Sequence, residues 1–355
     1  MKACLLWIMV SATLLIMAIP AAADQPAPLP KIKILALGGT IAGAAPSPME
    51  TKEYKPGVFD VSVLIKSVSG LDKIADISGE QLANINSADI TNEIMIRLAN
   101  RVNELLIKEG VDGIVITHGT DTLEETAYFL NLVVKSDKPV VVVGSMRPAT
   151  AVSADGPLNL YNAVVLASHN TARGKGVLVA LNEKIHGARE VTKTNTTNVD
   201  TFKSLDFGCL GYILDGNVFF YQVPLRRHTA KTEFKIDGIK TLPRVEIIYG
   251  HGHGNRDLVD AAVNAGSAGI IHAGSGDGSV FFITKEGLLA ARKKGVVVVR
   301  SSRVGSGVVT HTADDDNREF VTSDTLNPQK ARILLMLSLT RTRDSREIQR
   351  IFNEY

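Results

Sequence analysis

Short apolar runs rich in β-branched residues alternate along this chain with longer segments of helical period. The runs are apolar throughout rather than at every second residue, which is typical of parallel strands covered on both faces. In the first part of the chain we expect strands at 32–37, 113–117, 140–143 and 177–181. We expect helices between them at 92–107, 124–134 and 158–167. This alternation predicts an α/β fold with a mostly parallel sheet flanked by helices.

A second and shorter series of the same kind begins near residue 244. Its expected strands are 245–249, 268–272 and 296–300, and its expected helices are 256–265, 285–293, 328–340 and 344–352. Between the two series, residues 223–243 carry many charges and little apolar periodicity, as a linker would. We therefore predict a larger N-terminal α/β domain at 24–222, a linker at 223–243 and a smaller C-terminal α/β domain at 244–355.

The first 23 residues have the composition of a secretory signal peptide. Lys2 precedes an apolar run at 5–19, and three alanines at 21–23 supply the small residues that a signal peptidase needs. A membrane anchor is the alternative, but a spanning helix needs about 20 apolar residues, and Pro20 and Asp24 follow this run at once. We predict that residues 1–23 are a cleavable signal and that the protein is exported without a membrane span.

Charge and cysteine content exclude several classes of partner. Lysine and arginine number 39 against 37 aspartates and glutamates, which gives a net charge of only +2. The chain therefore lacks the excess of basic residues that binding to nucleic acid or an anionic membrane requires. Outside the predicted signal, Cys209 has no cysteine with which to pair. None of the 8 histidines lies in a His-Glu-x-x-His arrangement, and the pair at 251 and 253 has no further ligand at suitable spacing. We predict neither a disulfide nor a metal site.

Candidate chemistry follows two of the predicted strands. The first strand runs into a Gly-Gly-Thr segment ending at Thr40, and the strand at 113–117 runs into His-Gly-Thr-Asp ending at Asp121. In an open parallel sheet the ligand site lies beyond the carboxyl ends of the strands, where glycines expose N–H groups and a threonine hydroxyl can meet a substrate carbonyl. Neither dinucleotide nor P-loop spacing is present. A purely structural tight turn remains the alternative.

A threonine hydroxyl needs a base before it can act as a nucleophile or pass on a proton. Thr120 stands beside Asp121, and Lys193 is the single lysine in an uncharged polar run at 191–197. A lysine brought close to this pair would complete a proton relay. The alternative is an ordinary solvated surface lysine.

Several segments in the same order resemble bacterial type II L-asparaginases. They lie at 38–43, 116–122, 124–128, 144–148, 155–157, 191–197 and 326–332. The resemblance covers nearly the whole chain after the predicted signal. The sequences at 272–276 and 350–352 are most similar to those of periplasmic glutaminase-asparaginases. The resemblance implies a periplasmic enzyme that hydrolyses the side-chain amides of L-asparagine and L-glutamine to aspartate or glutamate and ammonia, through a threonine acyl-enzyme and without a cofactor.

The resemblance also implies roles for individual residues. By motif, Thr40 matches the nucleophile, and Tyr54 matches the tyrosine that closes over the substrate and hydrogen-bonds that nucleophile. Thr120, Asp121 and Lys193 match the family's proton relay.

Substrate binding and assembly are implied in the same way. Ser87 matches the serine that binds the substrate α-carboxylate, while Asp121 would also hold the α-ammonium. Asp277 matches an asparagine supplied by a neighbouring subunit, which implies a homotetramer with shared active sites. The chain departs from the pattern at Ala88, where a glutamine or glutamate usually follows the serine.

Two other classes of protein compete with this interpretation. A periplasmic amino-acid binding protein would also have two α/β domains with a ligand between them, but it needs no pair of threonines and lysine at a sheet edge. A nucleotide-dependent amidotransferase component would be cytosolic, which the predicted signal argues against.

Overall fold

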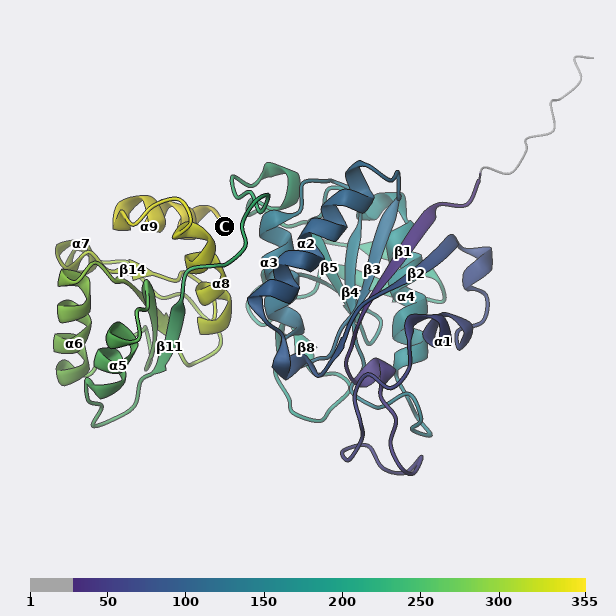
Figure 1. The fold of residues 1–355 in the computed structure, drawn as a ribbon, viewed down its shortest axis with the longest axis horizontal. Helices are drawn as coiled ribbons and strands as arrows, with labels where there is room; N and C mark the ends of the chain where they lie inside the picture. Colours follow the sequence, from purple (N-terminus) through teal and green to yellow (C-terminus); the bar gives the residue numbers. More distant parts are fainter. Residues whose placement is uncertain (1–27) are drawn as a thin grey trace, which may run out of the picture.

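The computed structural model describes residues 28–355, so the predicted signal peptide at 1–23 lies outside the described residues. A larger N-terminal and a smaller C-terminal α/β unit lie side by side (Figure 1). This arrangement confirms the predicted fold class. Within the described part of the chain, no helix is long and apolar enough to cross a membrane.

The larger sheet contains eight strands in the order β10-β9-β6-β5-β4-β3-β1-β2. Its parallel strands are β1 (Lys31–Gly38), β2 (Asp76–Ile85), β3 (Gly113–Thr117), β4 (Val140–Val143) and β5 (Val177–Leu181). An antiparallel extension follows with β6 (Lys184–Gly187), β9 (Gly211–Leu214) and β10 (Asn217–Phe220). In this order β2 lies on one side of β1, and the next strand of the chain, β3, lies on the other side of β1. The crevice at which parallel sheets of this kind bind ligands therefore lies between the carboxyl ends of β1 and β3.

Helices cover both faces of this sheet. On one face lie α2 (Asn92–Ile107) and α3 (Leu123–Val133), and on the other lie α1 (Val61–Lys66) and α4 (Gly156–Ser168). Along β3, Ile114 and Ile116 pack toward α2 and α3, whereas Val115 packs toward α4. Since both of their faces are covered, the central strands β3, β4 and β5 have no polar face, which explains their unbroken apolar runs. Because α3 and α4 lie on opposite faces, the successive crossovers β3-α3-β4 and β4-α4-β5 have opposite hands.

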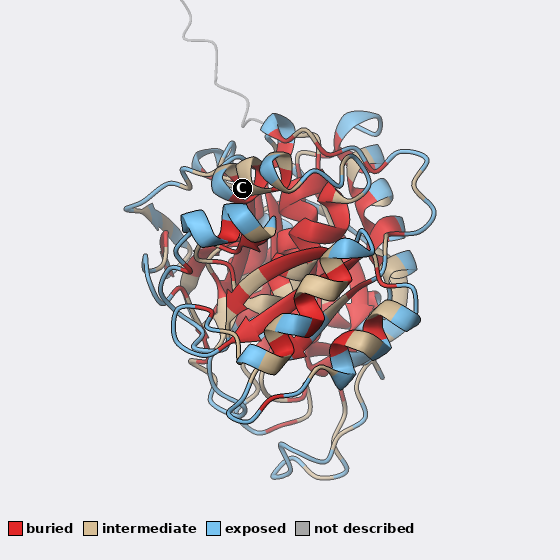
Figure 2. Ribbon diagram, turned by 90° about the vertical axis from the view of Figure 1, so that its left-hand side faces the viewer, coloured by how far each residue is buried: buried red, intermediate tan, exposed pale blue. Residues whose placement is uncertain are grey.

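The smaller sheet is parallel throughout. Its strands, in spatial order, are β11 (Val245–Tyr249), β12 (Gly269–Gly274), β13 (Val297–Ser302) and β14 (Val321–Thr322). One face packs on α5 (Asp257–Asn264) and α6 (Phe282–Lys293), the other on α8 (Pro328–Ser338) and α9 (Ser345–Glu354), while α7 (Ala313–Arg318) precedes β14. Figure 2 shows the buried strands behind helices whose outer surfaces are exposed.

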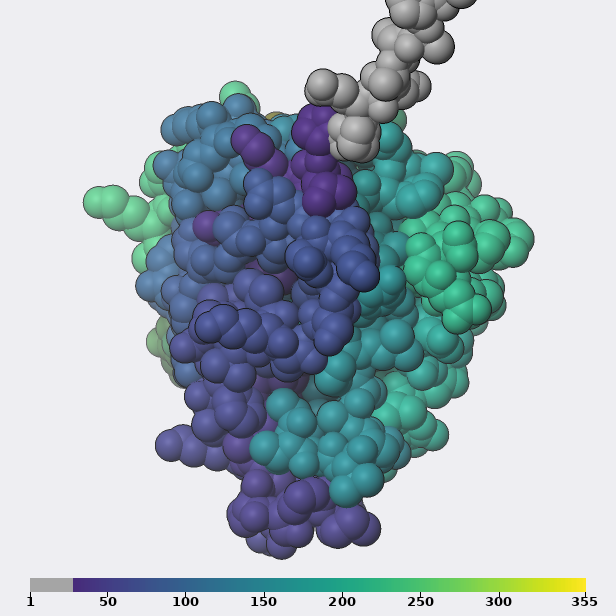
Figure 3. Space-filling model, turned by 90° about the vertical axis from the view of Figure 1, so that its right-hand side faces the viewer, coloured from purple at the N-terminus to yellow at the C-terminus, as the bar shows by residue number. Residues whose placement is uncertain are grey.

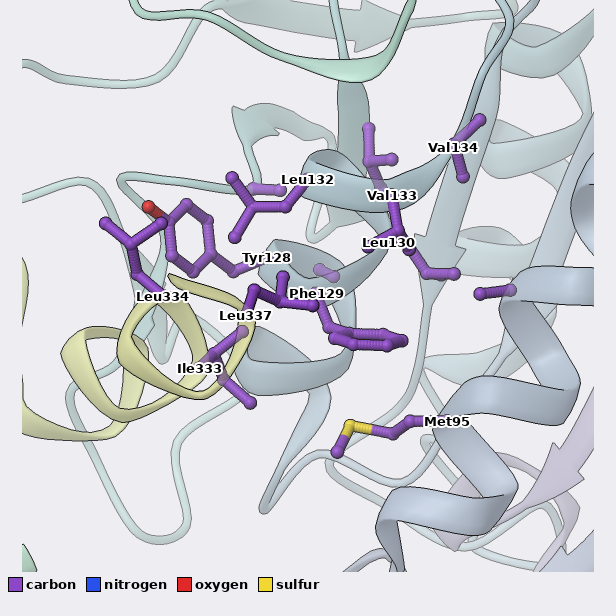
Figure 4. Close-up of a cluster of buried hydrophobic side chains, with 14 of the residues drawn as sticks. Met95, Tyr128, Phe129, Leu130, Leu132, Val133, Val134, Ile333, Leu334 and Leu337 are labelled. Carbon is purple, nitrogen blue, oxygen red and sulfur yellow. The ribbon is translucent and has the colours of Figure 1, made fainter. Parts of the chain in front are cut away.

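Helix α8 joins the two units through one continuous core. Its Ile333, Leu334 and Leu337 face Tyr128 and Phe129 of α3 (Figure 4). Burial of each such large side chain contributes about 1.5–3 kcal/mol, so this contact holds the C-terminal unit firmly against the N-terminal one.

The chain end and the predicted linker also belong to this core. An α-carboxylate oxygen of Tyr355, the last residue, accepts hydrogen bonds from the Tyr128 hydroxyl at 3.2 Å and from Arg189 Nε at 2.6 Å. Within 223–243, Phe234 and Ile236 are buried. The segment predicted as a linker therefore packs against the protein instead of running freely through solvent.

Candidate active site

Two Gly-Thr turns meet at the carboxyl ends of β1 and β3. The first contains Gly38 and Gly39 at φ of 96° and 79°, a conformation that glycine adopts without strain. A Cβ atom on Gly39 would lie 2.3 Å from the Cα of Gly119, so the two backbones approach too closely for any side chain there. The following threonines, Thr40 and Thr120, are only 6% and 5% exposed. The two Gly-Thr turns therefore lie against each other at the carboxyl ends of β1 and β3.

Thr40 and Tyr54 are in direct contact. The Thr40 Oγ1 and the Tyr54 phenol oxygen lie 2.6 Å apart. The chain between them folds back as a projection, visible at the lower end of Figure 3, and an antiparallel bridge closes it between Ala44 and Lys55 with N···O distances of 3.0 and 2.9 Å. This bridge holds Tyr54 over the first turn.

Lys193 lies beside the second turn. Its Nζ donates to Thr120 Oγ1 at 3.0 Å and to Asp121 Oδ1 at 2.7 Å. It comes from the short strand β7 (Thr192–Lys193), which pairs with β8 (Phe202–Lys203). The Lys193 side chain is 16% exposed and that of Asp121 is 58% exposed. The ammonium is therefore held close to the protein while the carboxylate remains accessible to a ligand.

Ser87 borders the same pair. It opens the 3₁₀ turn η3 (Ser87–Asp89) after β2, and its hydroxyl oxygen accepts the backbone N–H of Asp121 at 3.2 Å. The Thr122 hydroxyl donates to the Ser87 carbonyl at 2.7 Å. Since the Ser87 oxygen is already an acceptor, its own proton is available for another acceptor. Ala88, next in the chain, is exposed.

The buried His118 side chain stabilises the second turn through hydrogen bonds at both ring nitrogens. Its Nδ1 lies 2.7 Å from the Gly119 carbonyl and its Nε2 lies 2.9 Å from Thr126 Oγ1. Burial lowers the pKa of His118 to about 4, so the ring is neutral near pH 7. Because a carbonyl can only accept, Nδ1 carries the proton and Nε2 accepts from Thr126. His118 therefore acts as a fixed support for the turn.

Asp277, the remaining candidate, is held by contacts within the C-terminal unit. It lies after β12 in the C-terminal unit, where its carboxylate accepts the Thr310 N–H at 2.7 Å and the Thr310 hydroxyl. Its carbonyl accepts from Arg300 at 3.0 Å. No hydrogen bond in the described residues joins it to Thr40, Ser87 or Lys193.

Over residues 28–355 no group of three or more His, Cys, Asp or Glu side chains could hold a metal ion. The residues gathered at the carboxyl ends of β1 and β3 offer three hydroxyls, a phenol, an ammonium and a carboxylate. Such a set can supply a nucleophile, move protons and bind a small zwitterion.

The fold and this polar crevice define a two-domain α/β amidohydrolase. Residues 31–226 match the family model described as "Asparaginase, N-terminal", and residues 244–352 match "Glutaminase/Asparaginase C-terminal domain". The chain belongs to the L-asparaginase and glutaminase-asparaginase family of enzymes.

Full-length relatives agree with the family assignment. The chain is 56% identical to "L-asparaginase 2" of Bacillus subtilis, over 94% of this chain and 89% of the relative. It is 50% identical to "Glutaminase-asparaginase" of Pseudomonas fluorescens (92% and 91% covered) and 50% identical to "Probable L-asparaginase periplasmic" of Haemophilus influenzae (93% and 94% covered). A crystal structure of a "Probable Cytoplasmic L-asparaginase" from Campylobacter jejuni superimposes with a TM-score of 0.90 at 51% identity, covering 92% of this chain and all of that one.

Proposed function

We propose that this enzyme hydrolyses the side-chain amides of L-asparagine and L-glutamine through a covalent intermediate on Thr40. The observation that carries the proposal is the 2.6 Å contact between Thr40 and Tyr54, beside the Thr120, Lys193 and Asp121 chain of contacts. The Thr40 hydroxyl is paired with the Tyr54 phenol, and the Thr120 hydroxyl is hydrogen-bonded to Lys193. Two activated hydroxyls of this kind suit two successive acyl-transfer steps.

In the first step Thr40 Oγ1 attacks the amide carbon and passes its proton toward Tyr54. The carbonyl oxygen becomes negative, and backbone N–H groups of the two turns stabilise it. Within the described chain the amides of Thr40 and Thr120 have no hydrogen-bond acceptor of their own. One well-placed donor of this kind contributes about 3–4 kcal/mol. The C–N bond then breaks, ammonia leaves with the transferred proton, and an ester with Thr40 remains.

In the second step water attacks that ester. Thr120 Oγ1 takes a proton from the water and passes its own hydroxyl proton to Lys193, which gives one of its protons to the Asp121 carboxylate, along contacts of 3.0 and 2.7 Å. The proton returns from Asp121 by the same chain of contacts as the ester breaks. The ester bond breaks, Thr40 recovers its proton, and the carboxylic acid product leaves. Every atom is supplied by substrate, water and these side chains, so the proposed route uses no cofactor.

The two ends of the amino acid meet Ser87 and Asp121. The Ser87 hydroxyl, which already accepts from the chain, donates its proton to the substrate α-carboxylate. Asp121 gives one oxygen to Lys193, and its exposed carboxylate leaves the other for the substrate α-ammonium. Both contacts select free α-amino acids over peptides.

Ammonia release from asparagine and glutamine, measured side by side, tests the activity. We expect release from both amides. A protein that binds either amino acid but releases no ammonia would instead be an amino-acid binding protein, which is the competing function.

We expect the exposed Ala88 to widen the substrate range. Without the longer polar side chain usual beside Ser87, we expect the amine end of the site to accommodate glutamine's extra methylene. One methylene is worth only about 1–3 kcal/mol, so Ala88→Gln should lower the glutamine to asparagine ratio of kcat/KM by roughly 10-fold. Ala88→Ser, polar but short, is the control and should leave the ratio near wild type. An unchanged or raised ratio in Ala88→Gln would remove this explanation.

We propose export to the periplasm, with residues 1–23 as the signal and a mature chain divided at 24–222, 223–243 and 244–355. The apolar run before three alanines supports export. Relatives at similar identity bear both "periplasmic" and "cytoplasmic" in their names, so the signal of this chain carries the proposal. N-terminal sequencing of the exported protein would place the cleavage site.

We propose that the active form is a homotetramer in which Asp277 reaches a neighbouring subunit's crevice. Large apolar side chains of one segment support such contacts, since Phe207, Tyr221, Val223 and Leu225 are 52–94% exposed. Sedimentation and assay at the same concentrations should show activity falling as the protein dissociates. A fully active monomer would contradict the proposal.

A further inference from the structure

The first turn of α8, from the C-terminal unit, contacts both segments that carry the Thr120–Lys193–Asp121 contacts. Asn327 caps this helix, with its Oδ1 accepting the Lys330 N–H at 3.1 Å. Its Nδ2 donates to Glu124 Oε2 at 3.1 Å and contacts Thr192 Oγ1 at 3.4 Å. Gln329 Nε2 donates to the other Glu124 oxygen at 3.1 Å. Both carboxylate oxygens of Glu124 are thus bound by the other unit.

Lys330 extends this contact into the core. It is 1% exposed, and its Nζ donates to the carbonyls of Arg189, at 2.7 Å, and Val191. Glu124 Oε2 lies 3.8 Å away as its counter-charge. Burial and the Arg189 charge lower the pKa of Lys330 to about 8, while Glu124 and Glu190 act in the opposite direction. An ammonium this deeply buried persists only where several acceptors surround it.

The residues that α8 contacts are close in sequence to Asp121 and Lys193. Glu124 is in the first turn of α3, three residues after Asp121, and Val191 and Thr192 directly precede Lys193. Neither Asn327 nor Lys330 hydrogen-bonds Thr40 or Thr120 in the described chain.

We propose that Asn327 and Lys330 are positioning residues that hold Lys193 at hydrogen-bond distance from Thr120 and Asp121. The inference rests on the proposed function and adds a role for the C-terminal unit within the same chain. The strand that carries Lys193 has two residues and one partner strand, so it has few hydrogen bonds of its own. Asn327 and Lys330 supply the missing restraint from α8.

Removing this restraint should slow the chemical step more than it weakens binding. A displacement of about 1 Å in a catalytic group costs roughly 100-fold in rate. We expect Lys330→Met to lower kcat by about 10- to 100-fold with KM changed by less than about 3-fold, because neither Ser87 nor the accessible Asp121 oxygen contacts Lys330. Loss of one partner of a buried ion pair also destabilises a fold, so a second variant is needed.

Asn327→Ser is that second variant. Serine still caps the helix but is too short to reach both Glu124 and Thr192, so kcat should fall while the unfolding midpoint stays near wild type. Lys138→Met is the matched control. Lys138 Nζ likewise donates to two carbonyls, those of Leu106 at 3.1 Å and Val111 at 2.6 Å, but beside the amino end of β4, away from the crevice. The kcat of Lys138→Met should equal that of the wild type.

A double-mutant cycle with Lys193→Met tests the positioning role itself. If Lys330 acts through Lys193, Lys330→Met should lower kcat of wild type but cause no further loss once Lys193 is absent. Equal losses in both backgrounds, or an unchanged kcat in folded Lys330→Met and Asn327→Ser, would overturn the proposal. A folded wild type that releases no ammonia would instead refute the proposed function, so the two failures are distinguishable.

Discussion

Thr40→Ala is expected to reduce ammonia release from both amides by roughly 10⁴-fold or more, because it removes the nucleophile itself. Folding should persist, since the change deletes a hydroxyl and one methyl group and leaves the partly exposed Tyr54 free to bond water. Substrate binding, measured by calorimetry with asparagine, should remain close to wild type because Ser87 and Asp121 are untouched.

Thr40→Ser separates loss of the nucleophile from distortion of the turn. Serine keeps the hydroxyl and should retain measurable turnover, whereas alanine should not. Substantial activity in Thr40→Ala at an unchanged unfolding midpoint would show that another group attacks the amide.

Lys193→Met is expected to lower kcat by about 10³-fold, within the range that positioned acid–base groups contribute. Methionine has a similar length but no ammonium, so both the 3.0 Å contact with Thr120 and the 2.7 Å contact with Asp121 are lost. The loss should appear with asparagine and glutamine alike, because Thr120 acts on the acyl group and not on the distinguishing methylene. Steady-state kinetics on both substrates measure it.

Lys203→Met is the control for this change. Lys203 lies on the strand that pairs with the strand of Lys193, but its ammonium binds Asp200 instead of the crevice. Its kinetics should resemble wild type. A similar loss in both variants would mean that the strand pair, and not the Lys193 ammonium, is what catalysis needs.

The parallel core was predictable because both of its faces are covered. The predicted strands at 113–117, 140–143 and 177–181 coincide with β3, β4 and β5, and the helix at 92–107 coincides with α2. By contrast, the sequence pattern does not indicate β2. It is an edge strand with mostly exposed or half-buried side chains, so it lacks the unbroken apolar run that identifies a covered strand.

Local pattern also fails where distant segments meet. Phe234 and Ile236 are buried although charges surround them in the sequence, since their partners lie on other elements. The contact of Asn327 with Glu124 joins residues 203 positions apart, so no local spacing could reveal it. The sequence does predict that both Gly-Thr turns follow strands, where parallel sheets place their ligand sites. The structure adds that β1 and β3 are neighbours, which brings the two turns together.

Trapping the covalent intermediate with a reactive amide analogue identifies the hydroxyl that attacks the amide. The enzyme is quenched during turnover, its intact mass is measured, and the acylated peptide is mapped. We expect one acyl group per active chain, located on Thr40, and none in Thr40→Ala. An acyl group on Thr120 and never on Thr40 would contradict it.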